Sequence, residues 1–386
     1  MQQNTNCIKM KVAIVTLGRS HLINLARLLD QRADVEVTFY TMMPKSRCRM
    51  FGYKGRVVSL LLPIGLGEVI ISRIPGINPY KRSALRFRLR RVFDKLVAQC
   101  LRRCDVLIGL NGCAVESSKK AAKKYNAITI CDQGSSHIKT QDAVHYTYSD
   151  APLSAWNTEY MLKHYDAVKY LMAPSVYVKN SDIGNGIEKE RILYNPYGVN
   201  LKMFKPAPKP DDKSYDVIMV GSWWKHKGCD MLAEACINRL GVKLLHVGAV
   251  VDCVLPDSPL FKHVDFVAER DLPTYYSKAK IFAMPSLDEG YGLVLLQAAA
   301  CGLILVGSSR TGAPDTAALL GNSPECITID EPLSVDTIAD AIRRGLEIAH
   351  SLPEGKRKPY GDKIENISWE AYGDRWYNIL EEIVKK

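Results

Sequence analysis

The stretch 281–321 constrains the fold of this chain more than any other segment. Its first residues, Ile281 to Met284, form a short apolar run that predicts a buried strand. A segment rich in turn residues, Pro285 to Gly292, follows it. An apolar helix is expected from Gly292 to Cys301, and a second buried strand from Leu303 to Gly307. This succession of strand, loop, helix and strand is typical of a parallel α/β sheet.

The loop in this stretch carries a pattern suited to an anionic ligand. Glu289 lies just before the expected helix, and Gly290 and Gly292 leave backbone N–H groups uncovered there. A helix N-terminus flanked by glycines can bind a phosphate. Gln297 follows eight residues after Glu289, or roughly 12 Å along a helix, which is comparable to the reach from a sugar across a diphosphate to a ribose. The alternative is a buried α/β unit with an acidic loop.

The rest of the chain repeats the α/β pattern. A strand from Lys11 to Leu17, a turn at Gly18, a helix through about Arg32 and a strand from Val35 to Thr41 predict a Rossmann-type opening. The turn has one glycine instead of G-x-G-x-x-G, so a dinucleotide fingerprint is absent. On the residues alone, Gly18 can form a plain tight turn. Further strands are expected at 105–110, 127–131, 216–220, 244–248, 264–267 and 326–330.

His137 is a candidate site residue in the first half of the chain. It follows the strand 127–131 within the segment Gly-Ser-Ser-His. This places an imidazole at the carboxyl edge of the sheet, where open α/β sheets bind their ligands. A lone histidine is also often structural.

The motif PSLDEGYGLVLLQAAACG resembles the Glu-x7-Glu signature of family 4 retaining glycosyltransferases, the group 1 type of bacterial polysaccharide and lipopolysaccharide assembly. Glu289 matches the first Glu, and Gln297 replaces the second, which grips the ribose in that family. The turn Gly221 to Gly228 resembles a second motif, whose Arg and Lys clamp the donor diphosphate. Lys227 matches that Lys. Ser222 stands where the Arg is expected, and Lys225 could supply some of the lost charge.

The resemblance implies a GT-B fold, in which two Rossmann-like domains face each other across a cleft. The expected acceptor domain comprises residues 1–197 and 371–386, because a C-terminal helix crosses back to it, and the donor domain comprises residues 198–370. The implied catalytic residues are His137, Lys227 and Glu289. The implied contacts to the nucleotide sugar come from Gly18, Gly221, Ser222, Lys225, Lys227, Gly290, Tyr291, Gly292, Leu293, Val294 and Gln297.

The implied activity is transfer of a hexose or N-acetylhexosamine from a UDP- or GDP-sugar to a hydroxyl of a glycan or lipid-linked acceptor, with retention. Lys227 and the N–H groups after Glu289 would stabilise the leaving diphosphate. No Asp-x-Asp motif is evident, so neither a metal nor another cofactor is expected. Two alternatives stay open. The departures at Ser222 and Gln297 fit a nucleotide-sugar-binding subunit with impaired catalysis, and the same fold could also host a nucleotide-sugar epimerase.

Positive charge is concentrated in the N-terminal half of the chain. The net charge is +11, and residues 45–103 contain 15 Lys or Arg against only two acidic residues. We expect residues 81–103 to form a helix with basic faces, and the apolar stretch 57–71 to form a loop or short helical turns. Together they predict contact with an anionic membrane surface, although a basic face could also serve only solubility or donor steering. No nucleic-acid motif is present.

Several features predict a cytoplasmic protein held peripherally at the inner face of the membrane. The N-terminus is polar, so we expect no signal peptide. No apolar run reaches the roughly 18 residues needed to span a bilayer. The eleven cysteines are scattered and mostly lie in apolar segments, which is typical of reduced thiols. Residues 205–213, rich in Pro and Lys, are expected to link the two domains.

Overall fold

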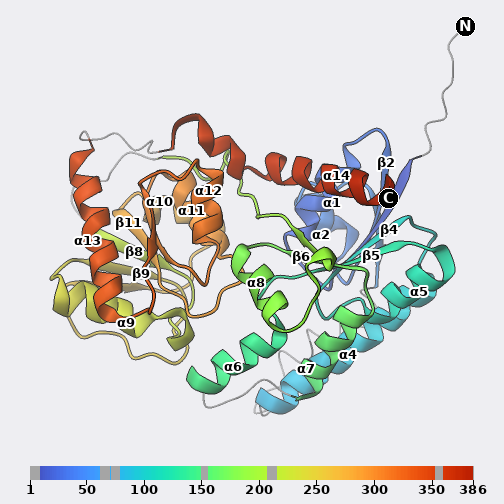
Figure 1. Cartoon of the computed structure of the whole chain (residues 1–386), viewed down its shortest axis with the longest axis horizontal. Coiled ribbons are helices and arrows are strands. Elements are labelled where there is room, and N and C mark those ends of the chain that lie inside the picture. The colour runs from blue at the N-terminus through green and yellow to red at the C-terminus, as the bar shows by residue number, and fades with distance from the viewer. Residues whose placement is uncertain are drawn as a thin grey trace, which may run out of the picture.

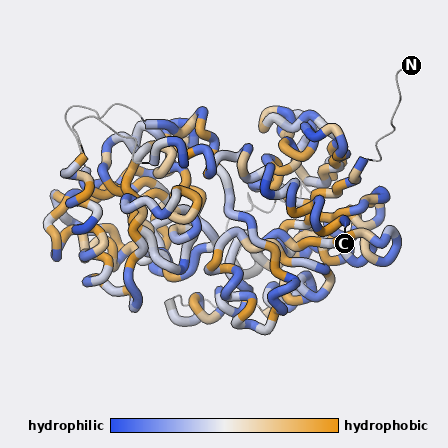
Figure 2. The backbone as a smooth tube through the Cα atoms, turned by 45° about the horizontal axis from the view of Figure 1, so that its top comes forward, coloured by the Kyte–Doolittle hydropathy of each residue, from blue (hydrophilic) through white to orange (hydrophobic). Residues whose placement is uncertain are grey.

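The computed structural model describes residues 9–60, 70, 79–148, 155–206, 215–352 and 360–385. They form two lobes, each built on one sheet (Figure 1). Every strand pair in both sheets is parallel. Figure 2 shows apolar segments running through the interior of each lobe. The two Rossmann-like lobes implied by the family resemblance are thus confirmed.

The first lobe contains a seven-stranded sheet of order β3-β2-β1-β4-β5-β6-β7. Successive strand residues face opposite sides, so α1 packs on one face of the sheet while α4 and α5 pack on the other. Its elements are β1 (Met10–Val15), α1 (Leu22–Asp30), β2 (Val35–Thr41), α2 (Lys45–Met50), β3 (Arg56–Ser59), α4 (Pro79–Cys100), β4 (Val106–Leu110), α5 (Val115–Tyr125), β5 (Ile128–Asp132), α6 (Ile138–Tyr148), α7 (Ala155–Asp166), β6 (Tyr170–Ala173), α8 (Val176–Gly184) and β7 (Ile192–Tyr194).

The second lobe contains a six-stranded sheet of order β10-β9-β8-β11-β12-β13. Helices α9 and α13 pack on one face, and α11 and α12 pack on the other. Its elements are β8 (Tyr215–Val220), η3 (Lys225–Lys227), α9 (Cys229–Ala233), the π-helical turn η4 (Glu234–Arg239), β9 (Leu244–Val247), β10 (Phe261–Val264), α10 (Leu272–Tyr276), β11 (Ala279–Met284), α11 (Leu293–Ala300), β12 (Ile304–Ser308), α12 (Ala313–Leu319), β13 (Cys326–Ile329), α13 (Val335–Ser351) and η6 (Gly361–Ile367).

The last helix, α14 (Trp369–Lys385), crosses from the second lobe back to the first and lies along α1 (Figure 1). Tyr372, Trp376, Leu380 and Ile383 recur every three or four residues, so they form one buried face. Gly373 allows the close approach, because a Cβ at this position would lie 2.9 Å from Leu28. The crossing helix expected from the GT-B resemblance is confirmed.

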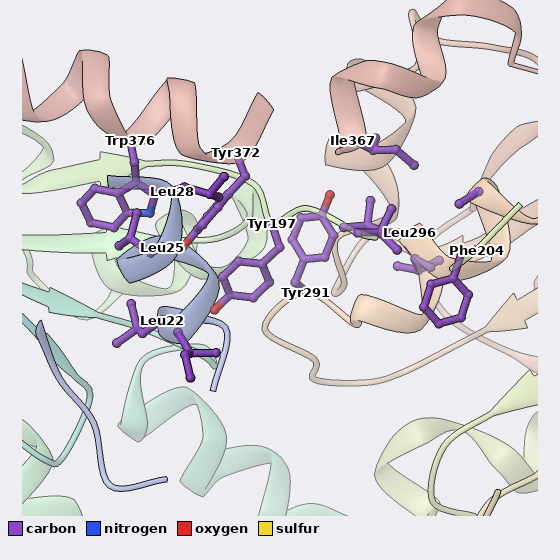
Figure 3. Close-up of a cluster of buried hydrophobic side chains, with 14 of the residues drawn as sticks. Leu22, Leu25, Leu28, Tyr197, Phe204, Tyr291, Leu296, Ile367, Tyr372 and Trp376 are labelled. Atoms are coloured by element: carbon purple, nitrogen blue, oxygen red, sulfur yellow. The ribbon is translucent and has the colours of Figure 1, made fainter. Parts of the chain in front are cut away.

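The apolar core continues from one lobe to the other. Tyr197 lies between the side chains of α1 and α14 on one side and Tyr291 of the second lobe on the other (Figure 3). The rings of Tyr197 and Tyr291 are 5.5 Å apart. The segments around Val199 and Ser368 both run between the lobes, and these two residues form a parallel bridge. This arrangement holds the lobes at one end and leaves the loops at the carboxyl ends of the strands facing each other.

Two local predictions from the sequence were wrong. Val57 and Val58 begin the stretch expected to be a loop, but they lie in β3 and pair with β2. Pro63 and the glycines beyond made the whole stretch look like a loop, whereas two β-branched residues suffice for a short edge strand. The strand expected at 264–267 instead ends at Val264, because Phe261 to Val264 pair in register with β9.

Parts of two further predictions lie outside the described residues. The first is the loop expected at 57–71, of which residues 61–69 and 71 are not described. The second is the linker expected at 205–213, of which residues 207–213 are not described. Among the helices that are described, none combines the length and apolar character required to cross a bilayer.

Candidate active site

The loop between β11 and α11 forms the centre of the candidate site. It is fixed by hydrogen bonds from Leu287 N to His226 O, at 2.8 Å, and from Glu289 N to Arg310 O, at 3.0 Å. Gly292 has a φ of 83°, and a Cβ at this position would lie 2.3 Å from Met284. Only glycine fits there without strain, so the chain turns sharply into α11.

Five consecutive N–H groups at this turn, those of residues 290–294, have no acceptor within the described parts of the chain. They lie at the N-terminus of α11, where the helix dipole favours negative charge. The predicted backbone contacts of Gly290, Tyr291, Gly292, Leu293 and Val294 therefore lie together. This set of donors can bind an anion such as a phosphate.

Lys227 and Glu289 form an ion pair across two neighbouring loops. Lys227 Nζ lies 2.9 Å from Glu289 Oε2, and the side chains are 20% and 23% exposed. Lys227 ends η3, after β8, and Glu289 follows β11, the neighbouring strand. Gly228 brings the loops together, since a Cβ there would lie 2.3 Å from the Pro285 carbonyl oxygen. The structure thus joins two residues that the sequence motifs singled out separately.

The remaining residues of the β8 turn lie at different distances from this pair. Gly221 has a φ of 136°, and a Cβ built on it would lie 3.8 Å from Lys227 Nζ. Ser222 follows directly in the same turn. Lys225 is exposed, and its backbone N–H donates to Asp252 at 2.8 Å. Its ammonium group makes no ion pair within the described residues.

Gln297 and Tyr291 are more buried than open ligand contacts would be. Gln297 is 8% exposed, and its Oε1 accepts a hydrogen bond from the Tyr276 hydroxyl at 3.1 Å. Tyr291 is buried, and its hydroxyl lies 3.0 Å from Thr316 Oγ1. The Tyr291 side chain therefore belongs to the core, and only the backbone N–H of this residue can contribute to the candidate anion site. The Gln297 amide nitrogen donates to no acceptor in the described parts of the chain, while its oxygen is already engaged.

His137 does not join the Lys227–Glu289 pair. It is 1% exposed, its ring lies 5.0 Å from the Tyr165 ring, and its Nδ1 accepts from Lys139 N at 3.3 Å. Burial, together with the charge of Lys139, lowers the pKa of His137 to about 4. The imidazole is therefore neutral at pH 7.

Contacts between the lobes involve residues that the sequence reasoning missed. Asp288 Oδ1 accepts from Ser136 Oγ at 2.6 Å and from the Tyr177 hydroxyl at 2.9 Å. Burial raises the pKa of Asp288. Ser175 Oγ donates to Gly290 O at 2.6 Å. Asp288, next to Glu289, and Ser175 could have been noticed in the sequence as polar residues close to the motifs. Nothing in the sequence, however, indicates which residues of the other lobe they bond.

Close backbone contact accompanies these side-chain bonds. A Cβ at Gly290 would lie 2.1 Å from the Gly134 carbonyl oxygen, so the two loops touch directly. Gly18, in contrast, borders open space, since a Cβ there would meet no atom within 4 Å. Near it, His21 Nε2 lies 2.6 Å from Asp132 Oδ1, and both side chains are buried. His21 also lies against Tyr197, with ring centroids 4.4 Å apart.

A cavity of about 1120 Å³ opens beside this region, between the two lobes. Its walls include Ser20 and His21 from the first lobe and Leu293 from the start of α11. Arg19 and Glu269 form an ion pair across it. Among the described residues, no group of three or more His, Cys, Asp or Glu side chains is arranged to hold a metal.

Comparisons with known proteins agree with this architecture. Residues 214–347 match the family described as Glycosyl transferases group 1. An O-antigen chain mannosyltransferase B of Escherichia coli is 33% identical over 86 residues, which are 22% of this chain and 21% of that protein. A GDP-mannose-dependent monoacylated alpha-(1-6)-phosphatidylinositol monomannoside mannosyltransferase of Corynebacterium glutamicum is 30% identical over 218 residues, 48% of this chain and 55% of that protein.

The similarity to solved structures covers nearly the whole chain. The sucrose-phosphate synthase of Thermosynechococcus elongatus has a TM-score of 0.68 at 16% identity, over 97% of this chain and 99% of that one. The chain therefore has the GT-B fold that its motifs predicted. The sequence matches span about a fifth and just over half the length of the two curated relatives.

Proposed function

We propose that this chain, in which residues 214–347 are a group 1 glycosyltransferase domain, transfers a sugar from a nucleoside-diphosphate sugar to a hydroxyl of a glycan or lipid-linked acceptor. The observation that carries the proposal is the Lys227–Glu289 ion pair beside the five N–H groups at the start of α11, which have no acceptor among the described residues. A cation and a row of amide donors suit a leaving diphosphate. A carboxylate next to them suits the hydroxyl groups of a sugar.

Each group has a distinct task in the proposed reaction. Lys227 moves from Glu289 toward the phosphate oxygens as the glycosidic bond breaks and negative charge builds up on them. The N–H groups of residues 290–294 bind the same oxygens, and they need no reorientation, because Gly292 already fixes the turn. Glu289, released from the ion pair, accepts hydrogen bonds from the donor sugar. No step in this scheme requires a metal, so we propose a metal-independent transfer that retains the anomeric configuration.

The proposed donor is a UDP- or GDP-linked hexose or N-acetylhexosamine. The C. glutamicum relative is named as GDP-mannose-dependent, which makes GDP-mannose the first donor to test. The cavity beside Leu293 and Ser20 has the volume and position to take the nucleoside end. Gln297 can then donate its amide N–H groups to the ribose, while Tyr276 keeps its oxygen.

We also propose that the first lobe meets an anionic membrane surface through residues 45–103, on the cytoplasmic side. Helix α2 exposes Lys45, Arg47 and Arg49, and its last residue, Met50, is 82% exposed. Helix α4 exposes Arg88 and other basic residues, and a groove between α4 and α5 is lined by Lys95, Lys119, Lys120, Lys123 and Lys124. Basic side chains beside an exposed apolar one are suited to reversible binding of anionic lipid. Such binding would bring a lipid-linked acceptor to the cleft.

Purified protein incubated with a panel of nucleotide sugars tests the main proposal. We expect release of the nucleoside diphosphate from one donor, faster with glycan or lipid-linked acceptors, and unchanged after EDTA treatment. Proton NMR of the product is expected to show the same anomeric configuration as the donor. Nucleotide binding without release from any donor would favour a binding subunit instead, and inversion at C4 or C2 of the free donor would indicate an epimerase.

A further inference from the structure

Two histidines form a buried hydrogen-bonded chain behind the candidate donor site. His246, in β9, is fully buried, and its Nε2 lies 2.8 Å from the carbonyl oxygen of Gly221. Its Nδ1 lies 2.9 Å from Nδ1 of His263 in β10. His263 Nε2 in turn lies 3.1 Å from the exposed Asp265 carboxylate. Trp223 covers the other side of the His246 ring, with centroids 4.7 Å apart.

The partners determine where the protons lie. A carbonyl oxygen only accepts, so Nε2 of His246 must carry a hydrogen to bond Gly221. Burial lowers the pKa of His246 to about 4, so at pH 7 the ring is neutral and Nε2 holds its only proton. Nδ1 of His246 therefore accepts, and Nδ1 of His263 donates to it. The bonds from His263 to His246 and from His246 to Gly221 therefore both point toward the turn at Gly221. At the surface, the Asp265 carboxylate can only accept, so His263 Nε2 is the donor of that bond.

The bond to Gly221 also sets the direction of the next N–H group. In a trans peptide the C=O and the N–H point to opposite sides. With the Gly221 oxygen held toward His246, the N–H of Ser222 points the other way, and it has no acceptor in the described parts of the chain. Lys227 Nζ lies near the same turn, 3.8 Å from where a Cβ of Gly221 would be. Gly248 allows the carbonyl to pack there, because a Cβ at 248 would be 2.1 Å from it.

We infer that His246 is a positioning residue for the donor: it locks the peptide between Gly221 and Ser222 so that the Ser222 N–H binds a phosphate oxygen beside Lys227. This inference rests on the proposed function, because it names a further contact to the same diphosphate. It also explains how the turn can bind an anion although Ser222 lacks the guanidinium expected at its position. The Ser222 N–H, oriented by the bond between His246 and Gly221, takes over part of the role of the missing guanidinium.

Binding measurements on the full-length protein test the inference. His246→Leu removes the hydrogen to Gly221, whereas His246→Gln can still donate one from its amide. We expect His246→Leu to weaken the binding of UDP, GDP and inorganic pyrophosphate by about tenfold or more, and His246→Gln by no more than about threefold. His164→Leu is the matched control, because His164 is an equally buried histidine of the first lobe. It should leave these affinities within about twofold of the wild type.

A spectroscopic measurement separates positioning from a general loss of structure. Protein labelled with ¹⁵N-serine shows the Ser222 amide, which is assigned by its absence in Ser222→Ala. We expect this resonance to shift on addition of pyrophosphate in the wild type and in His246→Gln, and to respond little in a folded His246→Leu. If His246→Leu does not fold, His246→Met replaces it. The thioether also has no hydrogen to donate to Gly221, so the Ser222 response should again be small.

The outcomes are distinct. A folded His246→Leu with wild-type affinities and a wild-type Ser222 response would overturn the inference and leave the transferase proposal intact, and the same result in His246→Met would do so too. Wild-type protein that binds pyrophosphate through Ser222 but transfers no sugar would end the transferase proposal and support the inference. Wild-type protein that binds neither nucleotides nor pyrophosphate would overturn both.

Discussion

Lys227→Ala is the sharpest test of the candidate site, because the structure supplies a matched control. Lys227 and Glu289 are 2.9 Å apart at the carboxyl ends of β8 and β11. At the opposite ends of the same two strands, Lys280 and Asp216 form a second ion pair of 2.9 Å, with side chains 29% and 25% exposed. The two pairs have the same length and similar burial, so removing either lysine should have a similar effect on folding.

The magnitudes follow from the charge and the burial. Glu289 remains accessible to water, so loss of its partner should cost about 1 kcal/mol of unfolding free energy, and Lys280→Ala should cost about the same. In the proposed transfer reaction, Lys227 provides a charge-assisted hydrogen bond to the diphosphate, and we expect this bond to be worth roughly 1.5–3 kcal/mol. That corresponds to a fall of about 10- to 150-fold in kcat/KM for the donor. Lys280→Ala should change kcat/KM by less than about twofold.

The assay combines donor turnover with urea denaturation of both variants. The expected result is a shared small shift of the denaturation midpoint and a loss of turnover in Lys227→Ala alone. Equal turnover in the two variants would remove Lys227 from the mechanism. A large loss of stability in Lys227→Ala alone would show that the ion pair is structural. The fall in turnover would then give no information on the role of Lys227 in catalysis.

Three further predictions concern the signature, the pH dependence and the membrane. Glu289→Gln should reduce the transfer rate severely, because the proposed carboxylate contact to the sugar is lost. Gln297→Glu should lower the rate only slightly or improve nucleotide affinity, since Tyr276 can donate to a carboxylate equally well. The reverse order of effects in kinetics and calorimetry would show that the two roles are misassigned. Burial lowers the pKa of His164 to about 3 from 6.5, so the unfolded chain takes up a proton first as the pH falls below 6.5. This histidine should then reduce the unfolding free energy by about 2 kcal/mol between pH 7 and pH 5. Urea midpoints at the two pH values measure the change, and His164→Leu should lack that part of it. Binding to anionic vesicles should weaken with salt and drop when Arg88 and Arg91 are replaced by Ser, whereas equal sedimentation with neutral vesicles, or none with either kind at low salt, would refute the membrane contact.

Local sequence determined most of the individual elements. The apolar runs that became β1, β2, β8, β11 and β12 are short and end at turn residues, so burial on both sides of a parallel sheet was the only arrangement that their composition favoured. Glycine positions were also informative. Gly292 and Gly228 have φ values of 83° and 68°, which other residues adopt at a cost, so the turns that carry Glu289 and Lys227 were visible before the fold was known.

Tertiary structure alone decided which side chains meet. Ser136 and Asp288 are 152 positions apart, and their bond exists because the loops of two separate sheets touch at Gly134 and Gly290. The Tyr276–Gln297 bond likewise depends on how α10 and α11 pack. Gln297, which the motif singled out as a ribose contact, therefore also accepts a hydrogen bond within the core. Periodicity and turn chemistry act within a few residues, and they carry no information on such distant partners.

The clearest case is His246, which within its own strand is simply a buried residue with no functional signal. Its proposed role depends on the order of the strands, since β9 lies between β8 and β10 and so places His246 between the Gly221 carbonyl and His263. The sequence therefore determined the type of each layer and the glycine turns that we propose bind anions. The sheet order and the closure of the lobes decided which polar groups support those turns, because hydrogen bonds require atoms to be within about 3 Å and only the folded chain brings them that close.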